Sequence, residues 1–143
     1  MGMNERDKRI TAHIIPYMCK GDSFFFFLQK RSDNAGRHPG WFTIFGGGVE
    51  KGETLEETML RESQEELNFI PSNYFYVGEY SDDYSISHYY AVKVLDNFEE
   101  NIKINEGDYG KFFSEEEIKN ESKLTENNKK ILSNLLEQVR GVK

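Results

Sequence analysis

The sequence is short of the residues that cross-link secreted proteins or build zinc sites. Cys19 is the only cysteine, so an internal disulfide and any multi-cysteine zinc site are excluded. We expect Cys19 to be a small buried hydrophobe. The three histidines, His13, His38 and His88, lie in different segments without metal-ligand spacing. Because lone histidines are more often structural than catalytic, we assign them no role in chemistry.

The chain also lacks a long hydrophobic run and an excess of positive charge. Its longest unbroken apolar run is Phe24 to Leu28, and the charged start MGMNERDKRITAHII has no apolar stretch of signal-peptide length. The formal net charge is −7, which disfavours nonspecific binding to nucleic acid or anionic membrane. We therefore predict a cytoplasmic protein with no nucleic-acid or membrane partner. An anionic small substrate would need a metal ion or local basic groups to bind.

Length and composition predict one folded domain. A chain of 143 residues is long enough to bury a real core. Aromatic residues make up 14% of it, which argues against disorder despite the many charged residues. The sequence shows no repeat, low-complexity linker or internal boundary. We therefore predict that residues 1–143 form a single domain.

Six segments rich in β-branched and aromatic residues are expected to form strands. They are RITAHIIPYMCK (9–20), SFFFFLQKR (23–31), WFTIF (41–45), NYFYVGEYS (73–81), SISHYYAVKVL (85–95) and DYGKFF (108–113). Pro16 predicts that the first of them is an edge strand or carries a bulge. The polar DDY at 82–84 predicts a hairpin between the two strands that flank it.

Three segments are expected to form helices. Thr54 with Glu57, and Ser114 with Glu117, have the spacing of a capping box. The last helix is expected from about Thr125 onward, where apolar residues recur at helical spacing: Ile131, Leu132, Leu135, Leu136 and Val139. The order of strands and helices fits a mixed α/β or α+β sandwich with helices on both faces of a sheet.

The stretch RESQEEL (61–67) crowds three carboxylates together. On a helix, Glu62, Glu65 and Glu66 project within an arc of about 100°. Each like-charged neighbour costs about 0.2–0.5 kcal/mol on an isolated helix, unless something positive lies between the carboxylates. Converging carboxylates are suitable ligands for Mg²⁺ or Mn²⁺. The alternative is a solvated acidic face, and the residues upstream decide between the two.

Those residues extend the acidic helix into a longer pattern, GGVEKGETLEETMLRESQEELNF. Its key positions are, in order, Gly47, Glu53, Arg61, Glu62, Glu65 and Glu66. The pattern resembles the Nudix box, G-x5-E-x7-R-E-U-x-E-E-x-G-U, where U is an aliphatic residue. The flanking segments WFTIFGGGVE and EGDYGKFFSEEEI are similar to the flanks of that box. The chain therefore resembles the Nudix hydrolases, of the MutT type that act on nucleoside diphosphate-X compounds.

Two positions depart from the box. Asn68 stands where the family has the glycine that ends the helix, and asparagine tolerates the left-handed geometry required there. Ser63 stands where the family has an aliphatic residue facing the core. If it is buried, its hydroxyl needs a hydrogen bond, for which the carbonyl four residues earlier is a candidate. Neither change removes a metal ligand.

The resemblance implies a fold and an activity. It implies an α+β protein, an α/β/α sandwich in which a mixed curved β-sheet carries helices on both faces. It implies hydrolysis of a nucleoside diphosphate linked to a moiety X, such as a nucleoside triphosphate, by water attacking a phosphorus. The implied cofactor is Mg²⁺, with Mn²⁺ as a substitute, and the oligomeric state stays open between a monomer and a homodimer. The alternative is a catalytically weak or inactive Nudix-fold sensor of nucleotides or metabolites; the intact carboxylate set favours the enzyme.

The resemblance also implies roles for individual residues. The metal is expected to be held by the carboxylates of Glu62, Glu65 and Glu66 and by the carbonyl of Gly46. Glu53 and Arg61 are expected to support them through a bidentate ion pair. A glutamate on a later loop is the general base or an additional ligand in several branches, and Glu106 in NEGDYGKFF matches it. The catalytic residues expected are Glu53, Arg61, Glu62, Glu65 and Glu106.

The sequence says less about the substrate. Phe45, Tyr84 or Tyr89 are candidates for stacking on a base, although most such aromatics belong to a core, so no substrate-binding residue is assigned. The ADP-ribose branch has a proline about fifteen residues past its box; the stretch YSDDYSISHYY has none, which disfavours that branch. Tyr84 keeps the dinucleoside polyphosphate branch open. Which phosphorus is attacked stays open.

Overall fold

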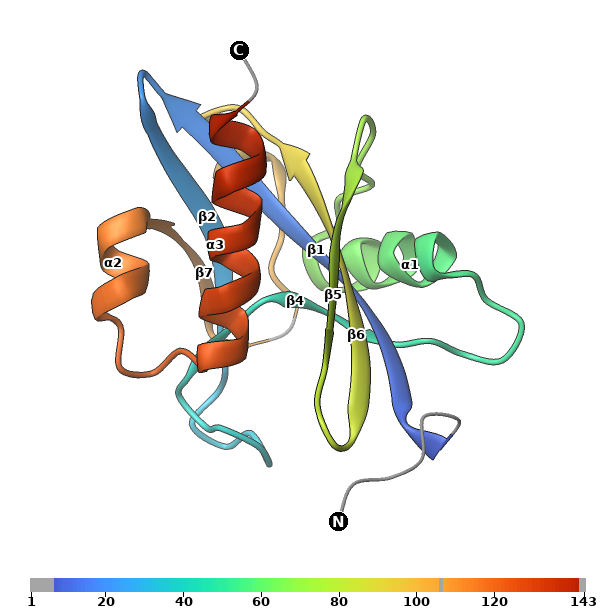
Figure 1. Ribbon diagram of the computed structural model, residues 1–143. Helices are drawn as coiled ribbons and strands as arrows, with labels where there is room; N and C mark the ends of the chain where they lie inside the picture. Colours follow the sequence, from blue (N-terminus) through green and yellow to red (C-terminus); the bar gives the residue numbers. More distant parts are fainter. Residues whose placement is uncertain (1–6, 106, 142–143) are drawn as a thin grey trace.

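The computed structural model of the chain describes residues 7–105 and 107–141, and its centre is a seven-stranded mixed sheet (Figure 1). The strands are β1 (Arg9–Lys20), β2 (Ser23–Lys30), β3 (Phe42–Thr43), β4 (Phe45–Gly48), β5 (Phe75–Ser81), β6 (Ser85–Lys93) and β7 (Tyr109–Ser114). Their order is β3-β2-β1-β6-β5, with β4 paired to β1 and β7 paired to β2. Strands β1 and β6 run parallel and the other pairs antiparallel, so the predicted mixed sheet is confirmed.

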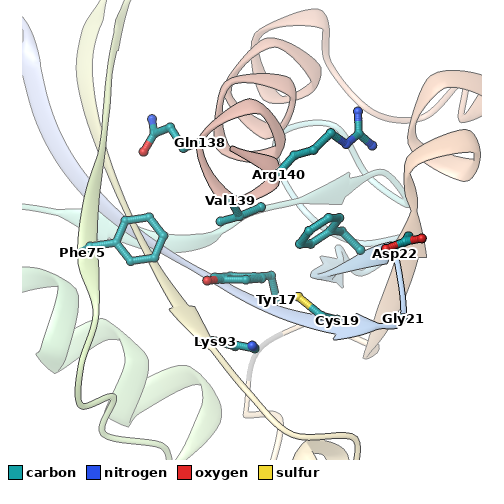
Figure 2. Close-up of a pocket in the computed structure, with 10 residues that line it drawn as sticks. Tyr17, Cys19, Gly21, Asp22, Phe75, Lys93, Gln138, Val139 and Arg140 are labelled. Atoms are coloured by element: carbon teal, nitrogen blue, oxygen red, sulfur yellow. The ribbon is translucent and has the colours of Figure 1, made fainter. Parts of the chain in front are cut away.

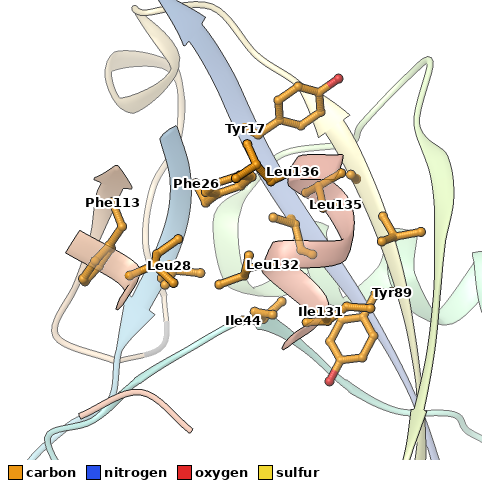
Figure 3. Close-up of a cluster of buried hydrophobic side chains, with 14 of the residues drawn as sticks. Tyr17, Phe26, Leu28, Ile44, Tyr89, Phe113, Ile131, Leu132, Leu135 and Leu136 are labelled. Carbon is orange, nitrogen blue, oxygen red and sulfur yellow. The ribbon is translucent and has the colours of Figure 1, made fainter. Parts of the chain in front are cut away.

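Helices cover both faces of this sheet (Figure 1). Helix α1 (Leu55–Leu67) packs on one face, and α2 (Glu115–Asn120) and α3 (Glu126–Arg140) pack on the other. A short 3-10 helix, η2 (Phe98–Asn101), adds to the α1 side. The core on the α3 side joins strand residues such as Leu28 and Tyr89 to the apolar stripe of α3 (Figure 3). The α/β/α arrangement predicted from the order of elements is therefore confirmed.

The expectation that Pro16 marks an edge strand is wrong, because β1 lies in the middle of the sheet. On one side β1 pairs continuously with β6. On the other side it pairs with β4 over 11–14 and with β2 over 17–20. Pro16 falls in the gap between these two partners, where a missing N–H costs no ladder hydrogen bond.

The segment WFTIF is not one strand. It divides at Ile44 into β3, which pairs with β2, and β4, which pairs with β1 and continues through the three glycines to Gly48. The change of partner at Ile44 brings the glycines alongside β1. The hairpin predicted at 82–84 is present, since β5 and β6 pair antiparallel across it.

The helix ends follow the sequence signals. Thr54 and Ser114 form the predicted capping boxes, and Thr125 caps α3. Asn68 ends α1 in the left-handed conformation, with φ 53° and ψ 40°, as its box position requires. No helix within residues 7–105 and 107–141 is long and apolar enough to cross a membrane.

Ser63 is fully buried, and the bond expected to the carbonyl four residues earlier is wrong. Its hydroxyl donates instead to the Phe69 carbonyl, six residues later, at 2.6 Å. The serine therefore ties the core side of α1 to the chain that leaves the helix. This bond explains how a hydroxyl is tolerated at an apolar position of the box.

Candidate active site

An ion pair between the loop carboxylate Glu53 and Arg61 of α1 forms the base of the site. Arg61 Nε donates to Glu53 Oε2 at 2.7 Å and Arg61 Nη2 donates to Oε1 at 3.0 Å, so the predicted bidentate geometry is present. Glu53 Oε1 also accepts the Glu50 N–H and the Thr58 hydroxyl, each at 2.9 Å. Both partners are thereby held in one orientation.

These bonds stabilise the charged forms of both side chains. Hydrogen bonds from the Arg61 guanidinium, and then from the Glu50 backbone, lower the pKa of Glu53 from 4.5 to about 2. The pair with Glu53 raises the pKa of Arg61. Glu53 is therefore ionised at every pH at which the protein is expected to work.

Glu53→Gln is expected to weaken the dependence of folding stability on acid pH. The folded-state pKa of Glu53 lies below its ordinary value, so its ionisation contributes stability above about pH 4.5 that is lost as pH falls toward 2. Urea unfolding at a series of pH values between 2 and 6 measures this. The variant should have a shallower slope in that window than the wild type, and equal slopes would contradict the ion pair's contribution.

Three carboxylates surround a single nitrogen of Arg61. Its Nη1 lies 3.0 Å from Glu62 Oε1, 3.3 Å from Glu65 Oε2 and 3.8 Å from Glu50 Oε1. The Glu62 side chain is 15% exposed and that of Glu65 58% exposed. The positive charge needed between the crowded carboxylates is supplied here by the arginine.

Glu66, the third glutamate of the cluster, lies deeper. It is only 2% exposed, whereas Glu65 beside it faces solvent. The three glutamates therefore share one side of α1 at different depths.

The glycine strand β4 presents backbone carbonyls to the same corner. Val49 donates its N–H to the Ile10 carbonyl at 2.9 Å, and hydrogen-bonded pairs alternate along an antiparallel ladder. By this alternation the peptide groups of Gly46 and Gly48 face away from β1. The Gly48 carbonyl accepts from Arg61 Nη2 at 3.1 Å. The register therefore places the Gly46 peptide on the same edge of β4 as the Gly48 carbonyl that Arg61 contacts.

Close contact explains why glycine is needed at position 47. A Cβ atom there would overlap with the Glu62 carboxylate. The carboxylate thus lies directly against the backbone of β4, as expected for a glycine that allows close approach. The loop that carries Glu53, strand β4 and helix α1 therefore meet at this corner.

The loop before β7 is attached to the end of α1. Asn105 donates its backbone N–H to the Glu66 carbonyl and its Nδ2 to the Glu65 carbonyl, both at 2.9 Å. Glu106, the expected base, lies outside the residues that the structure describes. Asn105 is therefore fixed beside the acidic helix. The role of Glu106 as general base stays a prediction.

A cavity of about 250 Å³ lies on the α3 side of the sheet, beside the N-terminal end of α3. Its lining combines basic, aromatic and amide side chains, including Arg31, Arg37, Trp41, Tyr89, Asn127 and Asn128. Tyr89 stacks on His13, with ring centroids 4.8 Å apart, and His13 is the cross-strand neighbour of Gly46. The cavity is therefore linked to the glycine strand through two packed rings.

Of the three aromatics considered for base stacking, only Tyr89 lines this cavity. Phe45 is fully buried in the core on the α1 side, as expected for most of these aromatics. Tyr84 is 63% exposed at the β5–β6 hairpin and is not among the residues that line the cavity. The dinucleoside polyphosphate branch thus gains no support from Tyr84.

A larger cavity, of about 890 Å³, lies at the opposite end of α3 (Figure 2). It is bounded by the C-terminal turn of α3, the β1–β2 hairpin and the start of β5, and its lining includes Tyr17, Cys19, Phe75 and Lys93. Cys19, expected to be a small buried hydrophobe, is only partly buried there and packs against the core on the α3 side. No residue of the acidic helix lines this cavity, and size alone does not make it the active site.

Comparison with known proteins decides the family. The NUDIX domain family model matches residues 7–135, which is most of the chain. The chain belongs to the NUDIX family. The resemblance inferred from the box is therefore confirmed.

Similar proteins agree with this membership. The nucleoside triphosphatase NudI of Salmonella agona is 49% identical over 43 residues, which are 30% of this chain and 30% of that relative. NudI of Salmonella arizonae is 50% identical over 42 residues, 29% of this chain and 30% of the relative. The matched segment thus spans less than a third of the length of these curated relatives.

Solved Nudix structures share the fold over nearly the whole chain. The MutT protein of Methanosarcina mazei is 20% identical with a TM-score of 0.74, covering 97% of this chain and 99% of that one. The NUDIX domain of Shewanella oneidensis NrtR, solved with ADP ribose, is 15% identical with a TM-score of 0.75, covering 92% of this chain and 88% of that one. At these identities the likeness establishes the α+β Nudix fold.

Nudix enzymes generally use divalent metal ions, so the corner around Arg61 can be tested as a metal site. Among residues 7–105 and 107–141, no three acidic, histidine or cysteine side chains form a ready-made metal site. The donors nevertheless fit a hard cation, because Glu62 and Glu65 already converge on one positively charged atom and the Gly48 carbonyl of β4 contacts the same arginine. The residues present fit Mg²⁺ or Mn²⁺ by chemistry, with Arg61 in contact with the carboxylates.

Sequence reasoning missed the residues that support and extend this Nudix site. Thr58, whose hydroxyl donates to Glu53, follows the cap Thr54 by one helical turn and reads as an ordinary helix residue. Arg31 and Trp41 lie at the ends of two expected strands, and Arg37 lies in the polar stretch between them. One signal in the sequence could have indicated them. Basic residues lie near an aromatic residue, and in an acidic chain such local positive charge suggests a site for an anionic ligand.

Proposed function

We propose that residues 1–143 form a single Nudix domain that hydrolyses a nucleoside diphosphate linked to a moiety X, a nucleoside triphosphate or a related nucleotide. Hydrolysis is proposed to depend on Mg²⁺, with Mn²⁺ as a substitute. The observation that carries the proposal is the convergence of Glu62 and Glu65 on Arg61 Nη1 beside the carbonyls of β4. The relatives named as nucleoside triphosphatases support the substrate class.

The side chains around Arg61 suit the binding of a cation. Arg61 Nε and Nη2 are bonded to Glu53 and Gly48, while only Nη1 faces Glu62 and Glu65. Arg61 therefore stays anchored when the two carboxylates turn from it toward a metal. The proposed ligands are the carboxylates of Glu62, Glu65 and Glu66 and the carbonyl of Gly46.

Phosphoryl and nucleotidyl transfer ask a protein mainly to position reactants and to neutralise charge. The bound cation supplies charge neutralisation for the phosphate oxygens and greater acidity for the attacking water. Glu53 and Arg61 hold the carboxylates in place. Glu106 is proposed to accept the proton from the water, in a loop that Asn105 ties to α1.

The cavity beside α3 is proposed to take the nucleoside part of the substrate. Trp41 and Tyr89 offer ring faces, Asn127 and Asn128 offer amide donors and acceptors, and Arg31 and Arg37 offer positive charge. Tyr89 and His13 connect this cavity to β4. A nucleotide lying across them can reach the carboxylates of α1 with its phosphates.

A panel of nucleotides assayed with and without Mg²⁺ tests the proposal. We expect release of phosphate or pyrophosphate that requires a divalent cation and is fastest at neutral to alkaline pH, because the carboxylates must be ionised and the water must lose a proton. Released products identify the phosphorus attacked. Undiminished hydrolysis after exhaustive treatment with EDTA contradicts the mechanism, and tight nucleotide binding without turnover would favour a sensor.

A further inference from the structure

The imidazole of His13 is a partly buried polar group to which the proposed chemistry gives no task. Its Nε2 lies 2.9 Å from Thr11 Oγ1, which donates to Ser87 Oγ at 2.8 Å. Its ring is stacked on Tyr89 with an interplanar angle of 16°. Burial lowers the pKa of His13 to about 4, despite backbone groups of Phe45 and Ile44 that raise it, so the ring is neutral at neutral pH.

The other edge of the ring faces β4. Position 13 and Gly46 are partners in the β1–β4 ladder, and they form a non-hydrogen-bonded pair, in which side chains lie closest to the opposite backbone. A Cβ on Gly46 would overlap with His13 Nδ1 and would lie 2.5 Å from the Ala12 carbonyl oxygen. Nδ1 itself is buried and makes no well-formed hydrogen bond to the described residues.

We propose that His13 is a positioning residue that fixes the Gly46 peptide and thereby the direction of its carbonyl. Glycine is the most conformationally permissive residue, and Gly46 has φ +154°, so its own backbone does not define that direction. The Thr11–Ser87 pair and the Tyr89 ring hold the imidazole on two sides, and the imidazole fills the space against Gly46. Tyr89 also lines the proposed nucleoside cavity. The stacked rings of His13 and Tyr89 therefore lie between that cavity and the proposed cation site.

This inference rests on the proposed function, in which the Gly46 carbonyl is a metal ligand. Removing the imidazole leaves a void beside Gly46 and lets its peptide rotate. Loss of an outer-shell partner of a metal site typically costs about 10- to 100-fold in metal affinity or activity. The expected defect is therefore weaker metal binding and a lower kcat, with the nucleotide KM at saturating metal little changed.

The test measures Mn²⁺ binding to the whole chain by electron paramagnetic resonance of the free ion, without nucleotide. His13→Ala should weaken Mn²⁺ binding roughly 10- to 100-fold. Ile15→Ala is the control, because Ile15 lies two residues along the same face of β1 in the core on the α3 side but does not pair with Gly46. It should melt at a lower temperature and bind Mn²⁺ as the wild type does.

Thr11→Val is a second variant that removes the Nε2 partner without opening a void, and it should weaken Mn²⁺ binding in the same direction but less. It carries the test if His13→Ala does not fold. Unchanged Mn²⁺ affinity in the folded His13→Ala or, failing that, in Thr11→Val overturns the positioning role, as does equal weakening in Ile15→Ala. A wild type that binds no Mn²⁺ overturns the proposed function instead.

Discussion

Glu65→Gln is expected to lower turnover by roughly 10²–10³, since a bound cation contributes several kcal/mol of charge stabilisation and each 1.36 kcal/mol is tenfold in rate. Glu65 is the most exposed of the clustered glutamates, with its side chain 58% accessible to solvent. Among residues 7–105 and 107–141, its carboxylate pairs with Arg61, at 3.3 Å. A carboxylate so placed is free to turn toward a cation, and its amide replacement is a poorer ligand for one.

The same substitution should have little effect on folding without metal. It removes like-charge repulsion on α1 and also an exposed pair with Arg61 that contributes at most about 1 kcal/mol. These two effects oppose each other, so the metal-free melting temperature should stay close to that of the wild type. Arg61 retains Glu53, Glu62 and the Gly48 carbonyl, so the corner keeps its geometry.

Thermal melts with and without Mg²⁺ separate a ligand from a structural residue. Wild-type protein should gain stability by RT ln(1 + [L]/Kd), about 2.7 kcal/mol at 100 times Kd, and Glu65→Gln should gain less. Glu137→Gln, at an exposed position of α3, controls for the loss of one charge and should behave as the wild type in both assays. Normal hydrolysis by a Glu65→Gln protein that melts much lower without metal would make Glu65 a structural partner.

The residues of the box were predictable because their relation is local. These residues lie in one loop and the helix that follows it: Glu53 precedes the cap Thr54, and Arg61, Glu62 and Glu65 are on α1. Helical geometry and the capping box therefore determine where they meet. The bidentate pair of Arg61 with Glu53 follows from that geometry. The sequence did not predict which group lies between the carboxylates. The pattern alone does not show that Arg61 directs its Nη1 toward Glu62 and Glu65.

Sheet pairing explains the errors made along the strands. Nothing near Pro16 in the sequence reveals that the partner of β1 changes from β4 to β2 at that point. The division of WFTIF at Ile44 has the same origin, because β3 and β4 bond to different strands. Strand propensity describes a segment, whereas an edge or a break depends on partners far away in the chain.

The cavity beside α3 was unpredictable for a related reason. It brings Arg37, Tyr89 and Asn128 together from three distant segments, and each looks unremarkable alone. Tyr89 could be proposed for stacking, but its side chain could not be told from that of Phe45, which is buried on the other face. Only the register of β6 with β1 decides which aromatic faces the cavity.

Gly47→Ala is expected to leave the fold nearly intact and to reduce turnover by about 10²-fold, the loss that a misplacement near 1 Å can cause. Gly47 has no positive φ, so an alanine is compatible with its backbone. The three atoms nearest to the new methyl group all belong to the Glu62 carboxylate, which is the mobile end of a side chain and can move aside. Moving it takes Glu62 away from Arg61 Nη1 and from β4.

Two other glycines make the comparison decisive. Gly46→Ala would overlap with the backbone carbonyl of Ala12 and with the His13 ring that stacks on Tyr89, neither of which can move easily, so it should lower the melting temperature as well as activity. Gly141→Ala, at the end of α3, meets only ordinary contacts and should change neither. Melting curves and Mg²⁺-dependent turnover of all three are the measurements. If Gly47→Ala keeps wild-type turnover, the Glu62 carboxylate is not required against β4 and the proposed arrangement of the metal ligands is wrong.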